Sequence, residues 1–145
     1  KLDPKEFIML YEVTSSNTQG VDGKVYLSNG KIVETNHPLN HLPGFNPEEL
    51  IALAWSTCLN ATIKAILEQK GFKDLKSRVD VTCQLMKEKQ VGKGFYFQVN
   101  AVASIEKLSL SDSKLIVNKA HSRCPISKLI SNAKTINLDT VKWSV

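Results

Sequence analysis

The sequence is short of cysteine, of arginine and of long apolar runs, and each shortage excludes a class of protein. No run of about 18 apolar residues is present, which argues against a membrane-spanning helix, and residues 1–10 lack a signal-peptide pattern. The three cysteines, an odd number at wide spacing, argue against a disulfide-stapled secreted domain. We therefore expect a chain that works in a reducing, cytoplasmic setting, away from membranes.

Positive charge is present but dispersed over the sequence. The formal net charge is +5, yet the lysines are scattered singly and only two arginines occur, Arg78 and Arg123. Aromatic residues do not alternate with basic ones, so a mixed solvated surface is favoured over nucleic-acid binding. His37 and His41 share one loop, but no third metal-ligating residue lies nearby at a recognised spacing, and no metal site is expected.

The length and patterning of the chain suit one α+β domain. The 145 residues contain no internal repeat, low-complexity tract or linker, so residues 1–145 are expected to form a single domain. Turn sequences such as Asn29-Gly30 join neighbouring strands as antiparallel hairpins. Hydrophobic periodicity predicts strands at 7–15, 24–28, 31–34, 76–89, 95–105 and 135–143, and helices at 46–71, 111–121 and 125–133.

The longest predicted helix carries Cys58 at its centre. Asn46 suits the N-cap position, Pro47 suits the first helical position, and Gly71 suits the residue that stops the helix. Nearly every position between them is apolar, which is typical of a helix buried on nearly every side. Roughly 24 residues give a length of about 36 Å, which is longer than one small domain needs. Burial of the second side against the same helix of a partner, in a homodimer, is therefore expected.

Cys124 has a different setting. Pro125 suits the first turn of a short helix, which places Cys124 at or just before the helix N-terminus, where backbone N–H groups and Arg123 favour a thiolate. Cys58 and Cys124 together suggest a redox pair, whereas Cys83 is expected on the core-facing side of a strand and chemically inert. Two unrelated core cysteines are the alternative, because no CxxC motif joins the pair.

Two segments, NPEELIALAWSTC at 46–58 and HSRCPIS at 121–127, are similar to the OsmC/Ohr family of thiol-dependent hydroperoxide reductases. The order of elements agrees over nearly the whole chain. The resemblance implies an OsmC-like fold, an intertwined homodimer in which two long central helices pack against antiparallel sheets. It also implies that Cys58 is the peroxidatic cysteine, that Cys124 is the resolving cysteine, and that Glu48 holds a catalytic arginine.

The same resemblance implies a reaction. An organic hydroperoxide is reduced to an alcohol while Cys58 becomes a sulfenic acid, and Cys124 then condenses with it to form a disulfide. No bound cofactor is implied; an external dithiol, of lipoyl type in the Ohr branch, reduces the disulfide. The implied role is antioxidant, in a stress response. Apolar residues before Cys58 favour organic hydroperoxides over hydrogen peroxide, and the substrate-binding candidates among them are Leu50, Leu53, Ala54 and Trp55.

One position departs from the family pattern. The family carries an arginine in the turn after the first strand, and Val21 stands at that position here, so the peroxidase activity is expected to be weak. Lys24 and Arg123 are the candidates that would supply the missing cation at the substrate. The alternative function is a non-peroxidatic relative that senses redox state or binds a small apolar ligand. A structural or interaction domain with inert thiols is a third interpretation.

Overall fold

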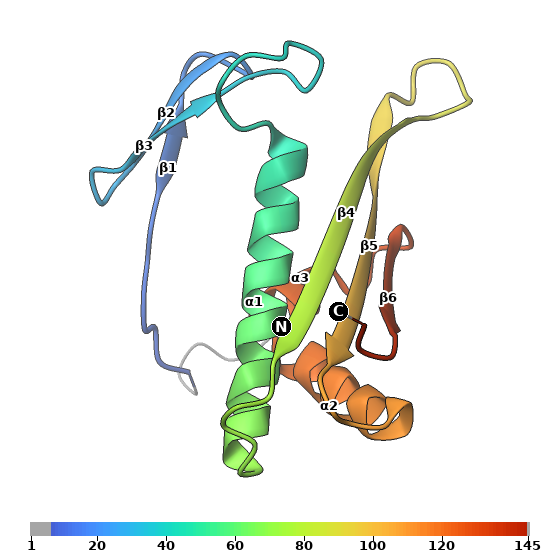
Figure 1. The fold of residues 1–145 in the computed structure, drawn as a ribbon. Helices are drawn as coiled ribbons and strands as arrows, with labels where there is room; N and C mark the ends of the chain where they lie inside the picture. The colour runs from blue at the N-terminus through green and yellow to red at the C-terminus, as the bar shows by residue number, and fades with distance from the viewer. Residues whose placement is uncertain (1–6, 145) are drawn as a thin grey trace. The chain divides into compact units, whose positions relative to one another are not determined.

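The order of elements is βββ-α-ββ-α-α-β in the computed structural model, which describes residues 7–144 (Figure 1). This order confirms the predicted α+β class. The chain divides into two units, residues 1–47 and residues 48–145, and each unit contains its own three-stranded sheet. That residues 1–145 form a single domain stays a prediction.

The first unit contains an antiparallel sheet formed by β1 (Ser15–Asn17), β2 (Gly23–Leu27) and β3 (Ile32–Thr35). The predicted hairpin is confirmed, because β2 and β3 pair across the Asn29-Gly30 turn, where Gly30 has a φ of 92°. The predicted strand at 7–15 is wrong for all but its last residue. Residues 7–14 belong to no strand of the described chain and are exposed throughout, since β-rich composition makes a strand only where a partner strand exists.

In the second unit, α1 (Pro47–Gln69) packs against a sheet in the order β4-β5-β6, formed by β4 (Ser77–Lys87), β5 (Phe95–Ile105) and β6 (Ile136–Thr140). The end of α1 follows the sequence signals. Gly71 has a φ of 86°, and its N–H donates to the carbonyl of Glu68 at 3.0 Å. The predicted helix stop is therefore confirmed.

The sheet of the second unit is mixed rather than purely antiparallel. β4 and β5 form the predicted hairpin, but β5 and β6 pair in parallel. The expectation of antiparallel sheets is therefore wrong for β6. Two helices, α2 (Leu110–Arg123) and α3 (Pro125–Ile130), lie between β5 and β6 along the chain and provide the crossover connection that a parallel pair requires.

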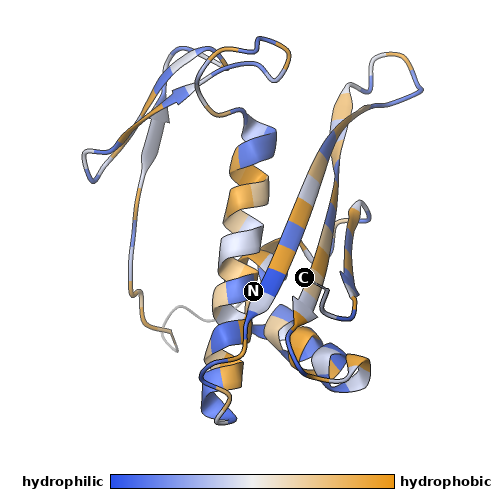
Figure 2. Cartoon of the chain, in the orientation of Figure 1, coloured by the Kyte–Doolittle hydropathy of each residue, from blue (hydrophilic) through white to orange (hydrophobic). Residues whose placement is uncertain are grey.

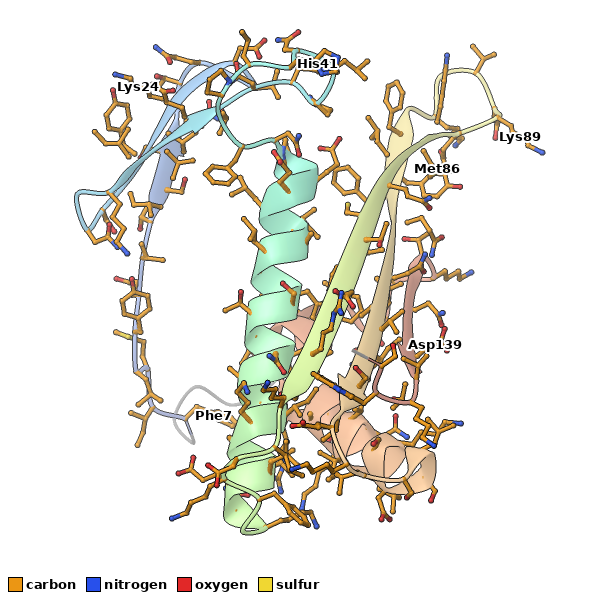
Figure 3. The ribbon with its side chains drawn as sticks, in the orientation of Figure 1. Phe7, Lys24, His41, Met86, Lys89 and Asp139 are labelled. Atoms are coloured by element: carbon orange, nitrogen blue, oxygen red, sulfur yellow. The ribbon has the colours of Figure 1, made fainter. Side chains whose placement is uncertain are left out.

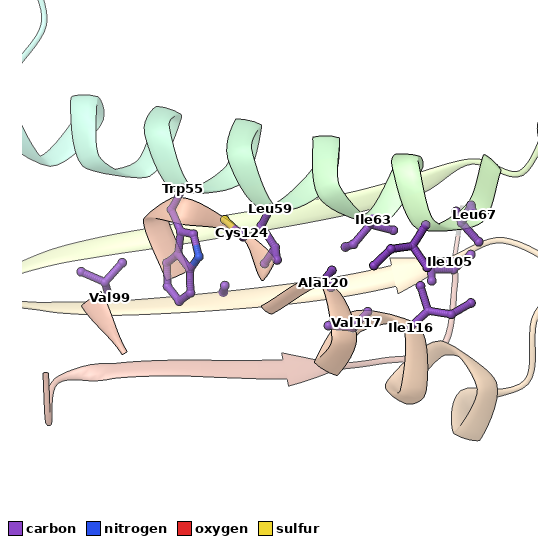
Figure 4. Packing of buried hydrophobic residues seen from close by; sticks show 13 residues of the cluster. Trp55, Leu59, Ile63, Leu67, Val99, Ile105, Ile116, Val117, Ala120 and Cys124 are labelled. Atoms are coloured by element: carbon purple, nitrogen blue, oxygen red, sulfur yellow. The ribbon is translucent and has the colours of Figure 1, made fainter. Parts of the chain in front are cut away.

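The hydrophobic core of the second unit lies between one side of α1, the sheet and α2 (Figure 4). The α1 residues on that side share full or nearly full burial: Trp55, Leu59, Ile63, Ile66 and Leu67. They pack with small and branched residues of β5 and α2, among them Ala101, Ala103, Ile105, Val117 and Ala120. The sheet, α1 and α2 thus enclose a single core against one side of α1.

The opposite side of α1 is apolar but uncovered. Leu50 is 40% exposed, Leu53 is 50% exposed, and Ala54 is exposed as well. The hydropathy colouring of Figure 2 shows apolar turns along the helix. By length and composition α1 is apolar enough to cross a membrane, although its buried side forms the core. This side is exposed in the single chain, so burial of α1 on nearly every side, which requires the partner of a homodimer, stays a prediction.

Candidate functional site

The structure brings the sulfurs of Cys58 and Cys124 together. Cys58 lies near the middle of α1 and Cys124 lies between α2 and α3, yet the Cys124 thiol donates a hydrogen bond to the Cys58 sulfur at an Sγ–Sγ distance of 3.1 Å. Cys124 is fully buried, and Figure 4 shows its sulfur beside α1. Cys58 is partly exposed. A reagent from solution therefore meets Cys58 first.

The chain around Cys124 fixes the position of its sulfur. Cys124 is the C-cap of α2, where its N–H donates to the carbonyl of Ala120, and it is also the N-cap of α3. Pro125 follows in the first turn of α3, and the N–H of Ser127 donates to the Cys124 sulfur at 3.4 Å. The predicted placement of Cys124 at a helix start is confirmed.

The surroundings of Cys58 favour its neutral thiol. Burial raises the pKa of the Cys58 thiol above its ordinary value, the backbone N–H of Ile126 opposes this by lowering the pKa, and the neighbouring Cys124 raises it further. Because the thiolate is the nucleophile, a fast reaction at this sulfur needs an additional positive charge.

Trp55 belongs to the frame of this site rather than to a substrate surface. Its side chain is fully buried, and its indole Nε1–H donates to the Ser127 hydroxyl at 2.9 Å. The expectation that Trp55 lines the substrate surface is wrong, because the residue faces the core side of α1. The ring of His121 lies 6.5 Å from the Trp55 ring, measured between centroids. Sequence reasoning gave no role to Ser127 or His121, since only the packing of α1 on α2 and α3 brings them to Trp55.

Within the second unit, neither Arg123 nor Glu48 has a described interaction with Cys58. Arg123 is exposed, and Lys24 belongs to β2 of the first unit (Figure 3), with Val21 in the turn before it. Glu48 lies in the first turn of α1, about 15 Å of helix rise from Cys58. Its carboxylate charge acts instead on Cys83 of β4.

Cys83 is the thiol outside this pair. It is partly buried, packs against the core and lies opposite Val99 on β5, so the predicted core-facing position is confirmed. Burial, and to a lesser extent the Glu48 carboxylate, raise the pKa of the Cys83 thiol. Its neutral form is therefore favoured.

Residues 39–139 match the family model of OsmC-like proteins. The chain belongs to the OsmC-like protein family. This confirms the membership expected from the two cysteine segments and places Cys58 and Cys124 inside the matched region. Among the relatives of this OsmC-like chain, organic hydroperoxide resistance protein-like 2 of Staphylococcus epidermidis is 28% identical over 135 residues, which cover 90% of this chain and 94% of the relative.

Other OsmC-like proteins cover the chain to a similar extent. Organic hydroperoxide resistance protein OhrA of Bacillus subtilis is 25% identical over 140 residues, 92% of this chain and 97% of the relative. The crystal structure of a redox-protein candidate from Lactobacillus casei is 30% identical, has a TM-score of 0.86 and covers 99% of both chains. The similarity thus extends over both units of the chain.

Proposed function

We propose that this OsmC-like protein is a thiol peroxidase that reduces organic hydroperoxides to alcohols in the cytoplasm. The observation that carries the proposal is the 3.1 Å separation of the Cys58 and Cys124 sulfurs. A disulfide has an S–S length of about 2.05 Å, so the pair needs to close by only about 1 Å. The names of the relatives, organic hydroperoxide resistance proteins, supply the substrate class.

The exposure of the two thiols assigns their roles in the proposed reaction. The thiolate of the partly exposed Cys58 attacks a peroxide oxygen, the O–O bond breaks, the alcohol leaves with a proton, and Cys58 becomes a sulfenic acid. The buried Cys124 then attacks the oxidised sulfur, the S–O bond breaks, water leaves, and the disulfide forms. An external dithiol, for which we propose a lipoyl type, returns both thiols by exchange. No bound cofactor takes part.

An apolar stripe on α1 supports an organic substrate. Leu50, Ala54 and Cys58 are spaced by four residues and therefore lie along one side of the helix, and Leu53 is exposed beside them. An alkyl or aryl hydroperoxide would cover this apolar surface, whereas hydrogen peroxide would not. We propose Leu50, Leu53 and Ala54 as substrate contacts.

A coupled peroxidase assay tests the proposal. We expect continuous turnover with cumene hydroperoxide, and a kcat/KM about tenfold or more above that for hydrogen peroxide, because burying an aryl group contributes more than 1.4 kcal/mol. Dihydrolipoamide should support turnover better than thioredoxin. Equal rates with both peroxides would contradict the apolar substrate class.

Redox sensing is the alternative function that one observation favours. The raised pKa of Cys58 slows the attack of this residue on a peroxide. Slow attack suits a sensor that is oxidised once and whose oxidised form a partner protein then binds. The same assay separates the two functions, since a sensor gives one oxidation for each chain and no turnover, even when the dithiol is in excess.

We further propose that the protein is a homodimer whose two active sites each use residues of both chains. The exposed residues 7–14, and the apolar side of α1 where the substrate does not cover it, are surfaces that a second copy would cover. Glu48 is too far along α1 to serve the Cys58 of its own chain. We assign Glu48 to the site of the partner.

Mixing two inactive variants tests the shared site. Glu48→Ala and Cys58→Ser chains, each with little activity as homodimers, should regain activity on mixing, because a heterodimer contains one site with both Glu48 and Cys58. With random exchange we expect about a quarter of the wild-type activity, since half of the dimers are mixed and each has one complete site. Subunit exchange is checked by native mass spectrometry. No recovery after confirmed exchange would exclude the shared site.

Val21 is proposed to limit the rate. A guanidinium at this position would supply the positive charge that a Cys58 thiolate needs. Lowering a thiol pKa by one unit raises the thiolate fraction tenfold but reduces its nucleophilicity, so Val21→Arg should accelerate the first oxidation about threefold. Stopped-flow oxidation measures the rate. If Val21→Arg is no faster, Lys24→Ala and Arg123→Ala identify the residue that already supplies the charge.

A further inference from the structure

His121 carries a buried polar atom that the fold leaves without a partner. Within residues 7–144, its Nδ1 is the one buried side-chain nitrogen or oxygen with no hydrogen bond. An unsatisfied buried polar atom is destabilising, and in native proteins such atoms include groups with a redox or catalytic role. The cysteine reaction proposed above assigns no role to His121.

The position of His121 relates it directly to the cysteine pair. On α1, Trp55 and Cys58 are three residues apart and share one side of the helix. On α2, His121 and Cys124 are also three residues apart, and Cys124 keeps a helical φ of −63° although it ends the helix. Their Cβ atoms are therefore neighbours, about 5–6 Å apart.

The two helical pairs face one another. The ring centroids of Trp55 and His121 are 6.5 Å apart, and the sulfurs of Cys58 and Cys124 are 3.1 Å apart. Ser127 links the Trp55–His121 pair to the Cys58–Cys124 pair. Its hydroxyl accepts a hydrogen bond from the Trp55 indole, and its N–H donates one to the Cys124 sulfur. His121 and its unpartnered Nδ1 thus lie one helical turn before Cys124, on the side of α2 that faces α1.

We propose that His121 accepts the proton of Cys124 when Cys124 attacks the oxidised Cys58, an inference that rests on the proposed cysteine pair. Neutral imidazole carries one acceptor nitrogen, and Nδ1 is free for that function. As Nδ1 takes the proton, the Cys124 sulfur forms a bond to the Cys58 sulfur and the S–O bond of the sulfenic acid breaks. The hydroxide that leaves receives the proton from the imidazolium and departs as water. The Cys124 sulfur is oxidised and the Cys58 sulfur is reduced.

Within residues 7–144, no other group in contact with Cys124 accepts a proton, so its attack needs an acceptor such as His121. Among the described residues its thiol donates only to Cys58, its sulfur accepts only from the Ser127 N–H, and Cys124 is fully buried. The charged neighbours Arg123 and Lys128 are exposed cations, which do not act as bases. From the sheet, β5 presents apolar residues to this core, and Asp139 of β6 is exposed.

The test follows the attack of Cys124 without any peroxide. In a Cys83→Ser background, the aromatic disulfide DTNB reacts first with Cys58 and releases one thionitrobenzoate, and Cys124 then attacks the mixed disulfide and releases a second. The two releases are timed by stopped-flow absorbance from pH 6 to pH 9. His121→Asn keeps a polar side chain of similar size that does not accept a proton. His41→Asn, the same substitution in an exposed loop, is the matched control.

We expect His121→Asn to leave the first release unchanged and to slow the second about 10–30-fold at pH 7, because only a few per cent of an unassisted thiol is ionised there. The loss should shrink to less than about threefold at pH 9, where thiols ionise without help. His41→Asn should match the parent. An unchanged second release, or the same slowing at every pH, would overturn the proposal.

A second substitution and the peroxidase assay distinguish failure of the His121 inference from misfolding of the variant and from failure of the peroxidase proposal. If His121→Asn does not fold, His121→Gln is measured in the same way. If the protein consumes no organic hydroperoxide but the pH-dependent slowing is observed, the peroxidase proposal fails while the role of His121 is supported. Turnover of peroxide without an effect of His121 on the second release overturns the inference alone.

Discussion

Replacing Cys58 by serine should abolish the reduction of organic hydroperoxide, because no other described thiol is both accessible and paired with a second sulfur. Cys124→Ser should still undergo the first oxidation but stop there, with Cys58 held as a sulfenic acid or over-oxidised. Loss of a nucleophile of this kind costs about 10⁴-fold or more in rate. Mass spectrometry after peroxide treatment and thiol blocking follows each cysteine separately.

Cys83→Ser is the control for these variants. Its thiol packs against the core on β4 and has a raised pKa, so its removal should leave turnover within about twofold of the parent. In the wild-type protein we expect a Cys58–Cys124 disulfide and a reduced Cys83. A Cys58–Cys83 bridge, or loss of activity in Cys83→Ser, would contradict the assigned roles.

Trp55→Ala should destabilise the protein by about 3–5 kcal/mol, because it removes a fully buried indole and its hydrogen bond to Ser127. This is a large part of the 5–15 kcal/mol that a typical domain has in total. Trp55→Phe restores most of the packing but not the hydrogen bond and should cost about 1–2 kcal/mol. Urea unfolding at one protein concentration measures the three free energies.

Leu115→Ala provides the comparison on α2. Leu115 is 71% exposed, so its truncation should change the free energy of unfolding by about 0.5 kcal/mol or less. If Trp55→Ala is as mild as Leu115→Ala, the indole does not anchor α1 to α3 as described. If both are severe, Leu115 is covered in the assembled protein.

Local signals explain what the sequence reveals of the fold. The end of α1 at Gly71 and the hairpin at Asn29-Gly30 depend on a few adjacent residues, and both were predicted correctly. The alternation of apolar and polar residues along β4 and β5 likewise indicates which side of each strand faces the core. These features are encoded within short stretches of chain.

The rest depends on partners that lie far away in sequence. A helix that is apolar all round does not indicate which side meets the sheet, so Trp55 was placed on the substrate surface although it belongs to the core. In the strand predicted at 7–15, residues 7–14 have no partner strand in the described chain. The settings of Cys58 and Cys124 suggest a redox pair, but with 66 positions between them only the family resemblance distinguishes that pair from two unrelated cysteines.

The separation of the two cysteines along the chain also has a consequence for the reductant. A disulfide between residues 66 positions apart closes a long loop in the unfolded chain, which corresponds to about 4 kcal/mol of stability in the chain-entropy account. By linkage, the reduction potential of this disulfide is about 90 mV lower in the folded protein than in the unfolded chain. Reduction of a peroxide would therefore leave the protein in its disulfide form, which is the more stable one. Only a strongly reducing dithiol would then regenerate the two thiols.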